Sequence, residues 1–201
     1  MLEEELKELS SSAWDRAIDA IKKMNAEEAV ELINLIRSNC EKMHNQLTEW
    51  IWSLLTFIAN VYGEEDVGKA LRFRHECFPI KVEHLSAEEL ARNEAIYMGC
   101  AHFSNISVKE EDDKFIIRKD PCGSGGRMLK QRLNDPPYNL GVTSKGYDWS
   151  WEKKGVSYYC AHCCVREEAK INAGGPKIVE IKCPLSPEDP CYTYIYKKKN
   201  I

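Results

Sequence analysis

Apolar and polar residues alternate along the first hundred residues with the period of an α-helix. A short helix is predicted over about residues 13–24, and Asn25 is a suitable cap for a second one. No glycine or proline follows until Gly63, so the second helix is predicted to run for about 36 residues, or roughly 55 Å. Two shorter helices are predicted after it, over about residues 64–77 and 86–100.

Within the long helix, apolar residues recur every seven positions in two interleaved series. The two series are Ile33, Cys40, Leu47, Leu54 and Val61, and Ile36, Met43, Trp50 and Phe57. Such an a/d pattern over about four heptads is typical of a coiled-coil seam. Towards the end of the helix the apolar stripe widens, and a wide stripe needs more than one neighbour. The pattern predicts a helical bundle, which a second copy of the chain would complete as a homodimer through the long helix.

After about residue 103 the apolar pattern changes to the alternation of β-strands. Residues 106–108 and 115–117 flank an acidic turn, as in a β-hairpin, and residues 176–183 and 191–196 resemble two further strands. The segment between them includes a long loop that carries two tryptophans, which is typical of a functional lid.

These elements predict an α+β protein. Its helical bundle, with the long heptad-patterned helix, occupies residues 1–102. A small, mostly antiparallel sheet with long loops and many cysteines occupies residues 103–201, and both parts are expected to form one compact unit.

Composition and charge exclude several classes of protein. The chain is 43% hydrophobic and 30% charged, as folded proteins are, and its net charge of −4 argues against nucleic-acid binding. Its most apolar run, residues 50–61, is too short to span a membrane. The acidic N-terminus lacks the features of a secretion signal, so the nine cysteines are expected in a reducing cytoplasm. Clustered thiols there indicate metal binding or catalysis.

The densest group of reactive side chains is the stretch Tyr159-Cys160-Ala161-His162-Cys163-Cys164. A Cys-x-x-Cys motif brings two thiolates to one tetrahedral metal ion, as in zinc sites. No second motif of this kind follows, so the remaining ligands must come from distant residues. The candidates are Cys100, His102, Cys122, His162, Cys183 and Cys191. A redox dithiol and buried structural cysteines are the alternatives.

A second unusual stretch, Cys122-Gly123-Ser124-Gly125-Gly126-Arg127, precedes the thiol cluster. Its glycines permit positive φ or close backbone approach, and successive backbone N–H groups can hold an anion. An arginine guanidinium can pair with a carboxylate or phosphate. The stretch has neither the P-loop nor the dinucleotide-binding spacing. The prediction is that residues 123–126 and Arg127 bind a small anionic substrate, the alternative being a tight turn.

Short pieces of the chain resemble a known family. A helical region through Gly63-Glu64-Glu65, then a cysteine-containing stretch and a final strand at residues 189–194, is similar to bacterial L-2-amino-thiazoline-4-carboxylic acid hydrolase-like proteins. Residues 120–127 and 159–163 also resemble a pair of stretches in Cys-rich bacterial and archaeal proteins. The resemblance implies a cytoplasmic enzyme that handles a small carboxylated molecule.

The sequence leads to one principal hypothesis and two others. The principal one is a metal-dependent enzyme, with zinc or another transition metal, that acts as a hydrolase or lyase on a C–N or C–S bond of a small carboxylated molecule. Cys122, Cys160, Cys163 and His162 would hold the metal, and His162 and His102 are the acid–base candidates. The other two are a non-catalytic metal or redox sensor or ligand-binding protein, and a thiol-nucleophile enzyme without metal.

Overall fold

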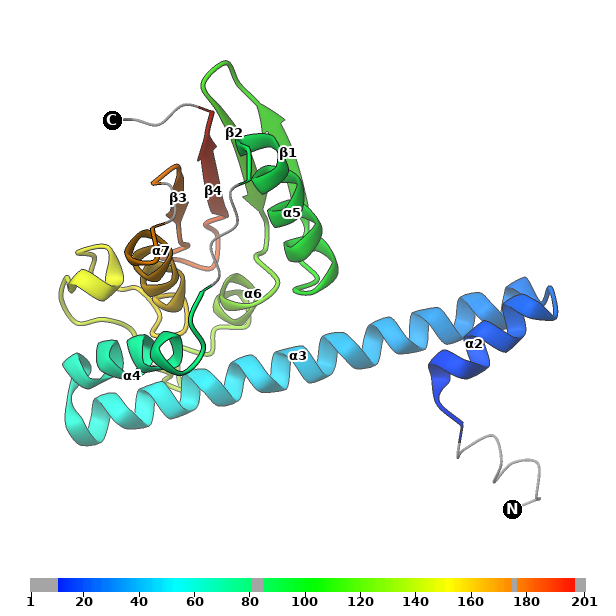
Figure 1. Cartoon of the computed structure of the whole chain (residues 1–201). Helices are drawn as coiled ribbons and strands as arrows, with labels where there is room; N and C mark the ends of the chain where they lie inside the picture. Colours follow the sequence, from blue (N-terminus) through cyan, green and yellow to red (C-terminus); the bar gives the residue numbers. More distant parts are fainter. Residues whose placement is uncertain (1–10, 81–84, 175–176, 198–201) are drawn as a thin grey trace. The chain divides into compact units, whose positions relative to one another are not determined.

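The computed structural model describes residues 11–80, 85–174 and 177–197. In these residues the chain is α+β, with a helical first half followed by a four-stranded antiparallel sheet (Figure 1). It forms two compact units, Met1–Gln46 and Leu47–Ile201. Residues 47–102 therefore belong to the same unit as the sheet.

The first unit contains helix α2 (Ala13–Lys22) and the first half of helix α3 (Ala26–Tyr62). The Ser12 side chain accepts a hydrogen bond from the backbone of Asp15 and so caps α2. Buried residues from both helices form a small apolar cluster, and Cys40 packs against it. The predicted helices are confirmed here to within two residues at each end.

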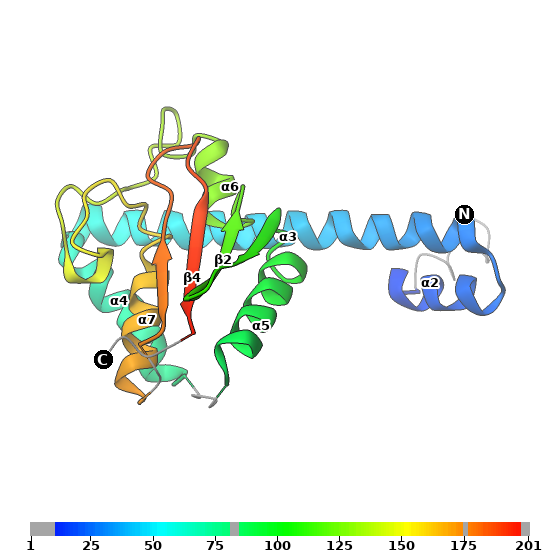
Figure 2. The same ribbon diagram turned by 90° about the horizontal axis from the view of Figure 1, so that it is seen from above.

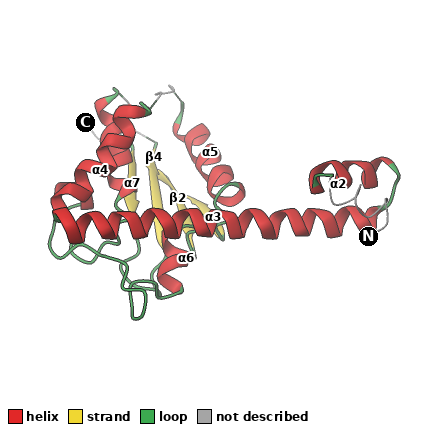
Figure 3. Cartoon of the chain, turned by 90° about the horizontal axis from the view of Figure 1, so that it is seen from below, coloured by secondary structure: helices red, strands yellow, loops and turns green. Residues whose placement is uncertain are grey.

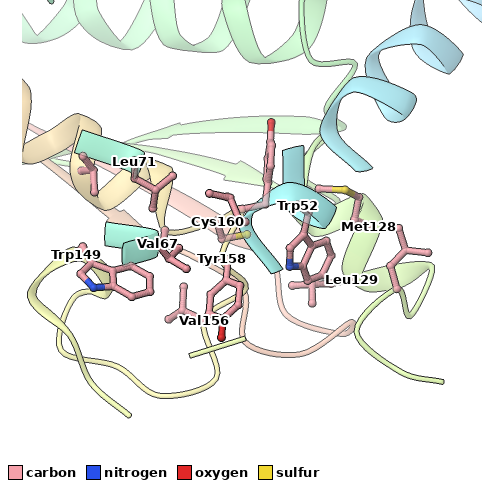
Figure 4. Packing of buried hydrophobic residues seen from close by; sticks show 14 residues of the cluster. Trp52, Val67, Leu71, Met128, Leu129, Trp149, Val156, Tyr158 and Cys160 are labelled. Atoms are coloured by element: carbon pink, nitrogen blue, oxygen red, sulfur yellow. The ribbon is translucent and has the colours of Figure 1, made fainter. Parts of the chain in front are cut away.

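The second unit is built on the second half of α3 and helix α4 (Glu64–Cys77). Its main core surrounds Trp52, which is fully buried and donates a hydrogen bond from Nε1 to the Gly141 carbonyl over 2.7 Å. Trp52 lies beside Met128 and Leu129, and Cys160 belongs to the same cluster (Figure 4). The long loop between α6 (Gly125–Lys130) and α7 (His162–Asn172) contributes to this core (Figure 3).

The long loop was predicted as a lid, and the structure places most of its aromatic residues in or against the core, with Tyr138 exposed. Trp149 is buried, and it lies so close to Gly68 of α4 that a Cβ on this glycine would overlap the indole ring. Val156 and Tyr158 are buried in the same cluster. This part of the loop holds α4 against the rest of the unit.

The sheet has the strand order β1-β2-β4-β3, and every neighbouring pair is antiparallel. Strands β1 (Ile106–Glu110) and β2 (Lys114–Lys119) form the predicted hairpin. Strands β3 (Val179–Lys182) and β4 (Cys191–Tyr196) follow α7, also as predicted, although Pro176 lies outside the described residues.

One face of the sheet is covered by two helices, α5 (Ala87–Cys100) and α7 (Figures 1 and 2). Helix α5 contacts β1, β2 and β4, and α7 contacts β3. The covered face carries the buried residues of the two central strands: Ile117, Lys119, Cys191, Thr193 and Ile195. A lysine, a cysteine and a threonine thus share this layer with two isoleucines. Helix α7 was not predicted, and it places the Cys-x-x-Cys motif at a helix N-terminus.

None of the helices in the described part of the chain combines the length and apolarity that crossing a membrane requires.

Candidate functional site

A small cavity lies between α5, α7 and the covered face of the sheet. Its lining includes five cysteines and five other ionisable side chains: Cys122, Cys160, Cys163, Cys183 and Cys191, with Glu94, His102, Lys119, His162 and Arg166. The cavity has a volume of about 40 Å³, which is room for about three water molecules. The cavity in this form therefore admits an ion or one end of a small molecule.

The two stretches singled out in the sequence meet in this cavity. All four predicted metal ligands line it: Cys122, Cys160, Cys163 and His162. His102, Ser124 and Gly125 line it as well, whereas Gly123, Gly126 and Arg127 do not. In the described parts of the chain, no group of three His, Cys, Asp or Glu side chains is arranged to hold a metal ion.

The glycines after Cys122 are explained by close packing. A Cβ on Gly123 would overlap the backbone carbonyl of His102, and a Cβ on Gly125 would overlap the sulfur of Cys160. The N–H of Gly123 donates to Ser104 Oγ over 2.8 Å. Positive φ is not involved, because the glycines with positive φ in the described residues lie elsewhere. The loop thus approaches both the end of α5 and the segment before α7.

Arg127 takes part in the same packing. Its guanidinium donates from Nη2 to the backbone carbonyl of Phe103 over 2.7 Å. The predicted substrate-binding arginine therefore lies outside the cavity lining and joins the start of α6 to the segment that follows α5.

Cys122 is held as a thiolate. Its pKa is lowered to about 5, first because the Cys191 thiol donates a hydrogen bond to its sulfur. The Lys119 ammonium and the backbone N–H groups of Ser124 and Gly126 also favour the negative sulfur, and together these outweigh the opposing effect of burial. Donors and a cation around a half-buried sulfur are the surroundings expected of a reactive cysteine.

Cys163 and His162 form a second polarised pair. Burial opposes ionisation of the Cys163 thiol, but the neighbouring His162 lowers its pKa overall. Cys163 Sγ lies 3.4 Å from His162 Nε2, and His162 Nδ1 donates to the Tyr159 carbonyl over 2.5 Å. That carbonyl orients the imidazole towards the sulfur, as in cysteine–histidine pairs.

The other cysteines of this region are neutral. Burial raises the pKa of Cys160 well above its ordinary value, and it raises that of Cys183 to about 12. Cys164, next to the cavity residues in sequence, has a pKa raised to about 11, also by burial. The cavity therefore contains cysteines of lowered pKa, Cys122 and Cys163, beside cysteines of raised pKa.

The charged residues of the cavity were not found from the sequence. Lys119 is buried, donates to Thr193 Oγ1 over 2.6 Å, and lies 3.7 Å from Glu94 Oε1. Arg166 Nη2 lies 3.7 Å from the same carboxylate oxygen. The Nε of Arg166 is buried, and it has no hydrogen-bond partner among the described residues. One sequence signal was available for Lys119, which occupies the position after Phe115 and Ile117 on the alternating apolar side of β2.

A chain of hydrogen bonds reaches the cavity from the end of α5. His102 Nδ1 and Ser124 Oγ lie 2.7 Å apart, and the Tyr159 hydroxyl also hydrogen-bonds Ser124. The ring of Tyr97 packs edge-on against the imidazole, with centroids 4.7 Å apart. These hydrogen bonds fix the His102 ring beside the Cys122 loop, where the imidazole can accept a proton.

The chain matches no protein-family model, no curated protein and no solved structure. Its function is therefore argued from the chemistry of the cavity. Two cysteines of lowered pKa, with adjacent cations and proton donors, are suited to attack on an electrophilic carbon.

Proposed function

We propose that the chain is a thiol-dependent enzyme with Cys122 as its nucleophile. The observation that carries the proposal is the environment of the Cys122 sulfur, which receives hydrogen bonds from the Cys191 thiol and two backbone amides beside the Lys119 ammonium. An ionised sulfur at neutral pH is the reacting form of a cysteine nucleophile. Its substrate is a small carboxylated molecule with a reactive C–N or C–S bond.

The proposed reaction has two steps. In the first, the Cys122 sulfur forms a bond to the electrophilic carbon, the C–N or C–S bond breaks, and the departing nitrogen or sulfur takes a proton. In the second, water attacks the same carbon, its oxygen replaces the Cys122 sulfur, and one of its protons returns to the group that protonated the leaving nitrogen or sulfur as the Cys122 thiolate is restored. The net reaction is hydrolysis, and the step order is that of covalent catalysis.

The neighbouring thiol is the proposed acid of the first step. Cys191 is neutral because its hydrogen bond to Cys122 and burial both raise its pKa. Cys191 therefore holds a proton next to the reacting Cys122 sulfur, from where it can protonate the departing nitrogen or sulfur. His102 lines the same cavity and is the candidate for activating water in the second step. His162, whose pKa the Cys163 sulfur raises against the opposing effect of burial, is suited to donate a proton.

Recognition of the substrate carboxylate is assigned to Arg166. Its buried Nε–H has no partner in the described residues, and a buried donor without a partner costs about 1–3 kcal/mol. A carboxylate oxygen from a ligand would satisfy it. This replaces the role expected for Arg127, whose guanidinium contacts the Phe103 carbonyl.

A second candidate is a zinc-dependent hydrolase or lyase that uses the same cavity. The observation that favours it is the convergence of Cys122, Cys163 and His162 on a space of about 40 Å³. Thiolates and imidazole are the donors that zinc prefers. A closed site of this kind without an open position would instead make the protein a non-catalytic metal sensor.

The first experiment is a turnover assay with L-2-amino-thiazoline-4-carboxylate, followed by a panel of small carboxylated thioesters, thioureas and cyclic amidines. For a compound that is turned over, acid-quenched protein is digested and the mass of each cysteine peptide is measured. We expect a substrate-derived mass on the Cys122 peptide and a loss of turnover of at least about 1,000-fold in Cys122→Ala. Cys77→Ala, which removes an exposed cysteine of α4, is the matched control.

Metal analysis of the same samples separates the two candidates. Full activity in chelator-treated, metal-free protein would reject the zinc candidate. Activity that is lost on chelation and restored by zinc, with no mass on the Cys122 peptide, would reject the covalent mechanism. Turnover that persists in Cys122→Ala would reject both.

A further inference from the structure

The second half of α3 carries a stripe of large apolar side chains that remains exposed among the described residues of the second unit. Five of them, Leu47, Trp50, Leu54, Phe57 and Val61, are each between 49% and 63% exposed. Their spacings alternate between three and four residues, as in a coiled-coil seam. We name these five residues the α3 seam.

The α3 seam is separate from the core contacts of the same helix. The core-facing side of α3 in this unit carries Thr48, Trp52 and Leu55, all of which are buried. On a helical wheel this side lies well away from the α3 seam, because residues advance by about 100° each. Packing within the second unit therefore accounts for the apolar residues on one face of α3, but not for those of the α3 seam on the other face.

Earlier members of the same heptad series show what covers this stripe. In the first unit, Ile36 belongs to the apolar cluster that α3 forms with α2, and Cys40 packs against it. Ile36 and Cys40 are a d and an a position of the series, whereas Ile33 and Met43, which belong to the same series in the first unit, are 47% and 57% exposed. The covering element there is an amphipathic helix, so the continuation of the stripe is suited to another helix.

We propose that the α3 seam pairs with the α3 seam of a second copy of the chain. Residues 46–62 contain one charged residue, Glu49, which lies outside the a, d, e and g positions. Charges at the e and g positions of a coiled coil normally favour a partner of different sequence or repel a second copy of the same helix. Residues 46–62 carry no charge at these positions. Two copies can thus approach through this face without repulsion.

The area agrees with a dimer. Side chains of this size carry on the order of 150–250 Å² each, so the half-exposed α3 seam leaves about 500 Å² of apolar surface in water. Two copies would bury about 1,000 Å² in total, which is the lower limit for a specific interface. The interface is isologous, because the same patch is used on both copies. It does not depend on the proposed enzymatic function.

The test is a concentration series of the full chain, from about 1 to 100 µM, in sedimentation-velocity centrifugation. We expect a monomer–dimer equilibrium for the wild type. Trp50→Glu combined with Phe57→Glu places two charges in the seam and should weaken the dimer at least about 100-fold. Phe73→Glu is the matched control, because Phe73 is an equally exposed aromatic residue on α4 outside the seam.

Far-UV circular dichroism and thermal melting of each variant show that its fold is retained, which the exposure of both aromatic residues favours. A wild type that stays monomeric at every concentration would overturn the proposal. A double variant that dimerises as strongly as the wild type would overturn it too, since another surface would then make the contact. Equal weakening by Phe73→Glu would show general apolar association and reject the α3 seam.

Discussion

Cys122 and Cys160 line the same cavity, yet the two regions that hold them have opposite effects on the thiol. The Cys191 thiol of β4, the Lys119 ammonium of β2 and two backbone N–H groups of its own loop surround the Cys122 sulfur, and its pKa falls to about 5. The segment around Cys160 belongs to the apolar core, and burial raises the pKa of its thiol. Donors and cations, and not burial, separate a reactive cysteine from an inert one here.

This comparison changes the meaning of the Cys-x-x-Cys motif. The motif suggests two equivalent metal-binding thiolates. His162 lowers the pKa of Cys163 against the opposing effect of burial, whereas burial raises the pKa of Cys160 well above its ordinary value. The partner of functional interest for Cys163 is therefore the adjacent imidazole, and the most polarised cysteine lies outside the motif.

The largest expected effect is in the pH dependence of alkylation. The protein is treated with iodoacetamide between pH 6 and 8, and labelling of each cysteine is followed by peptide mass spectrometry. Below its pKa a thiol gains about tenfold in thiolate fraction for each pH unit, so labelling of Cys160 should rise about 100-fold over this range. Cys122, already ionised above pH 5, should change by less than about twofold.

Cys164 is the internal control for that experiment. It is buried, its pKa is raised to about 11, and it does not line the cavity, so its labelling should rise in parallel with that of Cys160. If Cys122 labelling rises with pH as steeply as the other two, the thiolate assignment is wrong.

The fold was largely predictable because it follows local periodicity. The helical period and Gly63 set the limits of α3, and the alternation of apolar residues located all four strands. Helix α7 was missed because it begins without a capping side chain after Ala161. Its first residues were interpreted for their thiols and imidazole, which obscured the helical segment that follows them.

The candidate site was predictable in part. Cysteine clustering and the glycine loop identified two walls that do line one cavity. Arg166 was missed because a single charged residue carries no spacing signal. Lys119 was missed although its place in the alternation of β2 indicates the inner face, which its register and burial show. Arg127 was placed at the site by its sequence neighbours, whereas tertiary packing gives it the Phe103 carbonyl. Contacts between distant segments decide such roles.

The next largest effect is on stability, and it tests whether the Cys122 loop packs directly against the segment around Cys160. Gly125→Ala should destabilise the protein by about 1–3 kcal/mol, because the new Cβ would overlap the Cys160 sulfur. In a Cys160→Ala background that sulfur is gone, so the same substitution should cost much less. Denaturant unfolding of the four proteins in this double-mutant cycle measures the coupling.

Gly123→Ala gives the matched control for the cycle. Its Cβ would overlap the backbone carbonyl of His102, which Cys160→Ala does not remove. Its cost should therefore be the same in both backgrounds. Equal costs of Gly125→Ala in both backgrounds would show that the two walls are not in contact at this point.

The smallest effect tests which groups lower the pKa of Cys122. Cys191→Ala removes the donor with the largest influence and should move the midpoint of Cys122 alkylation upward by about one pH unit. Lys119→Met removes a cation of smaller influence and should move it upward by less. Lys114→Met makes the same charge change at the other end of β2, where Lys114 pairs with Glu111 and Asp113, and should leave the midpoint unchanged. Equal shifts from the two lysine variants would mean that net charge, and not the position of Lys119 beside the sulfur, controls Cys122.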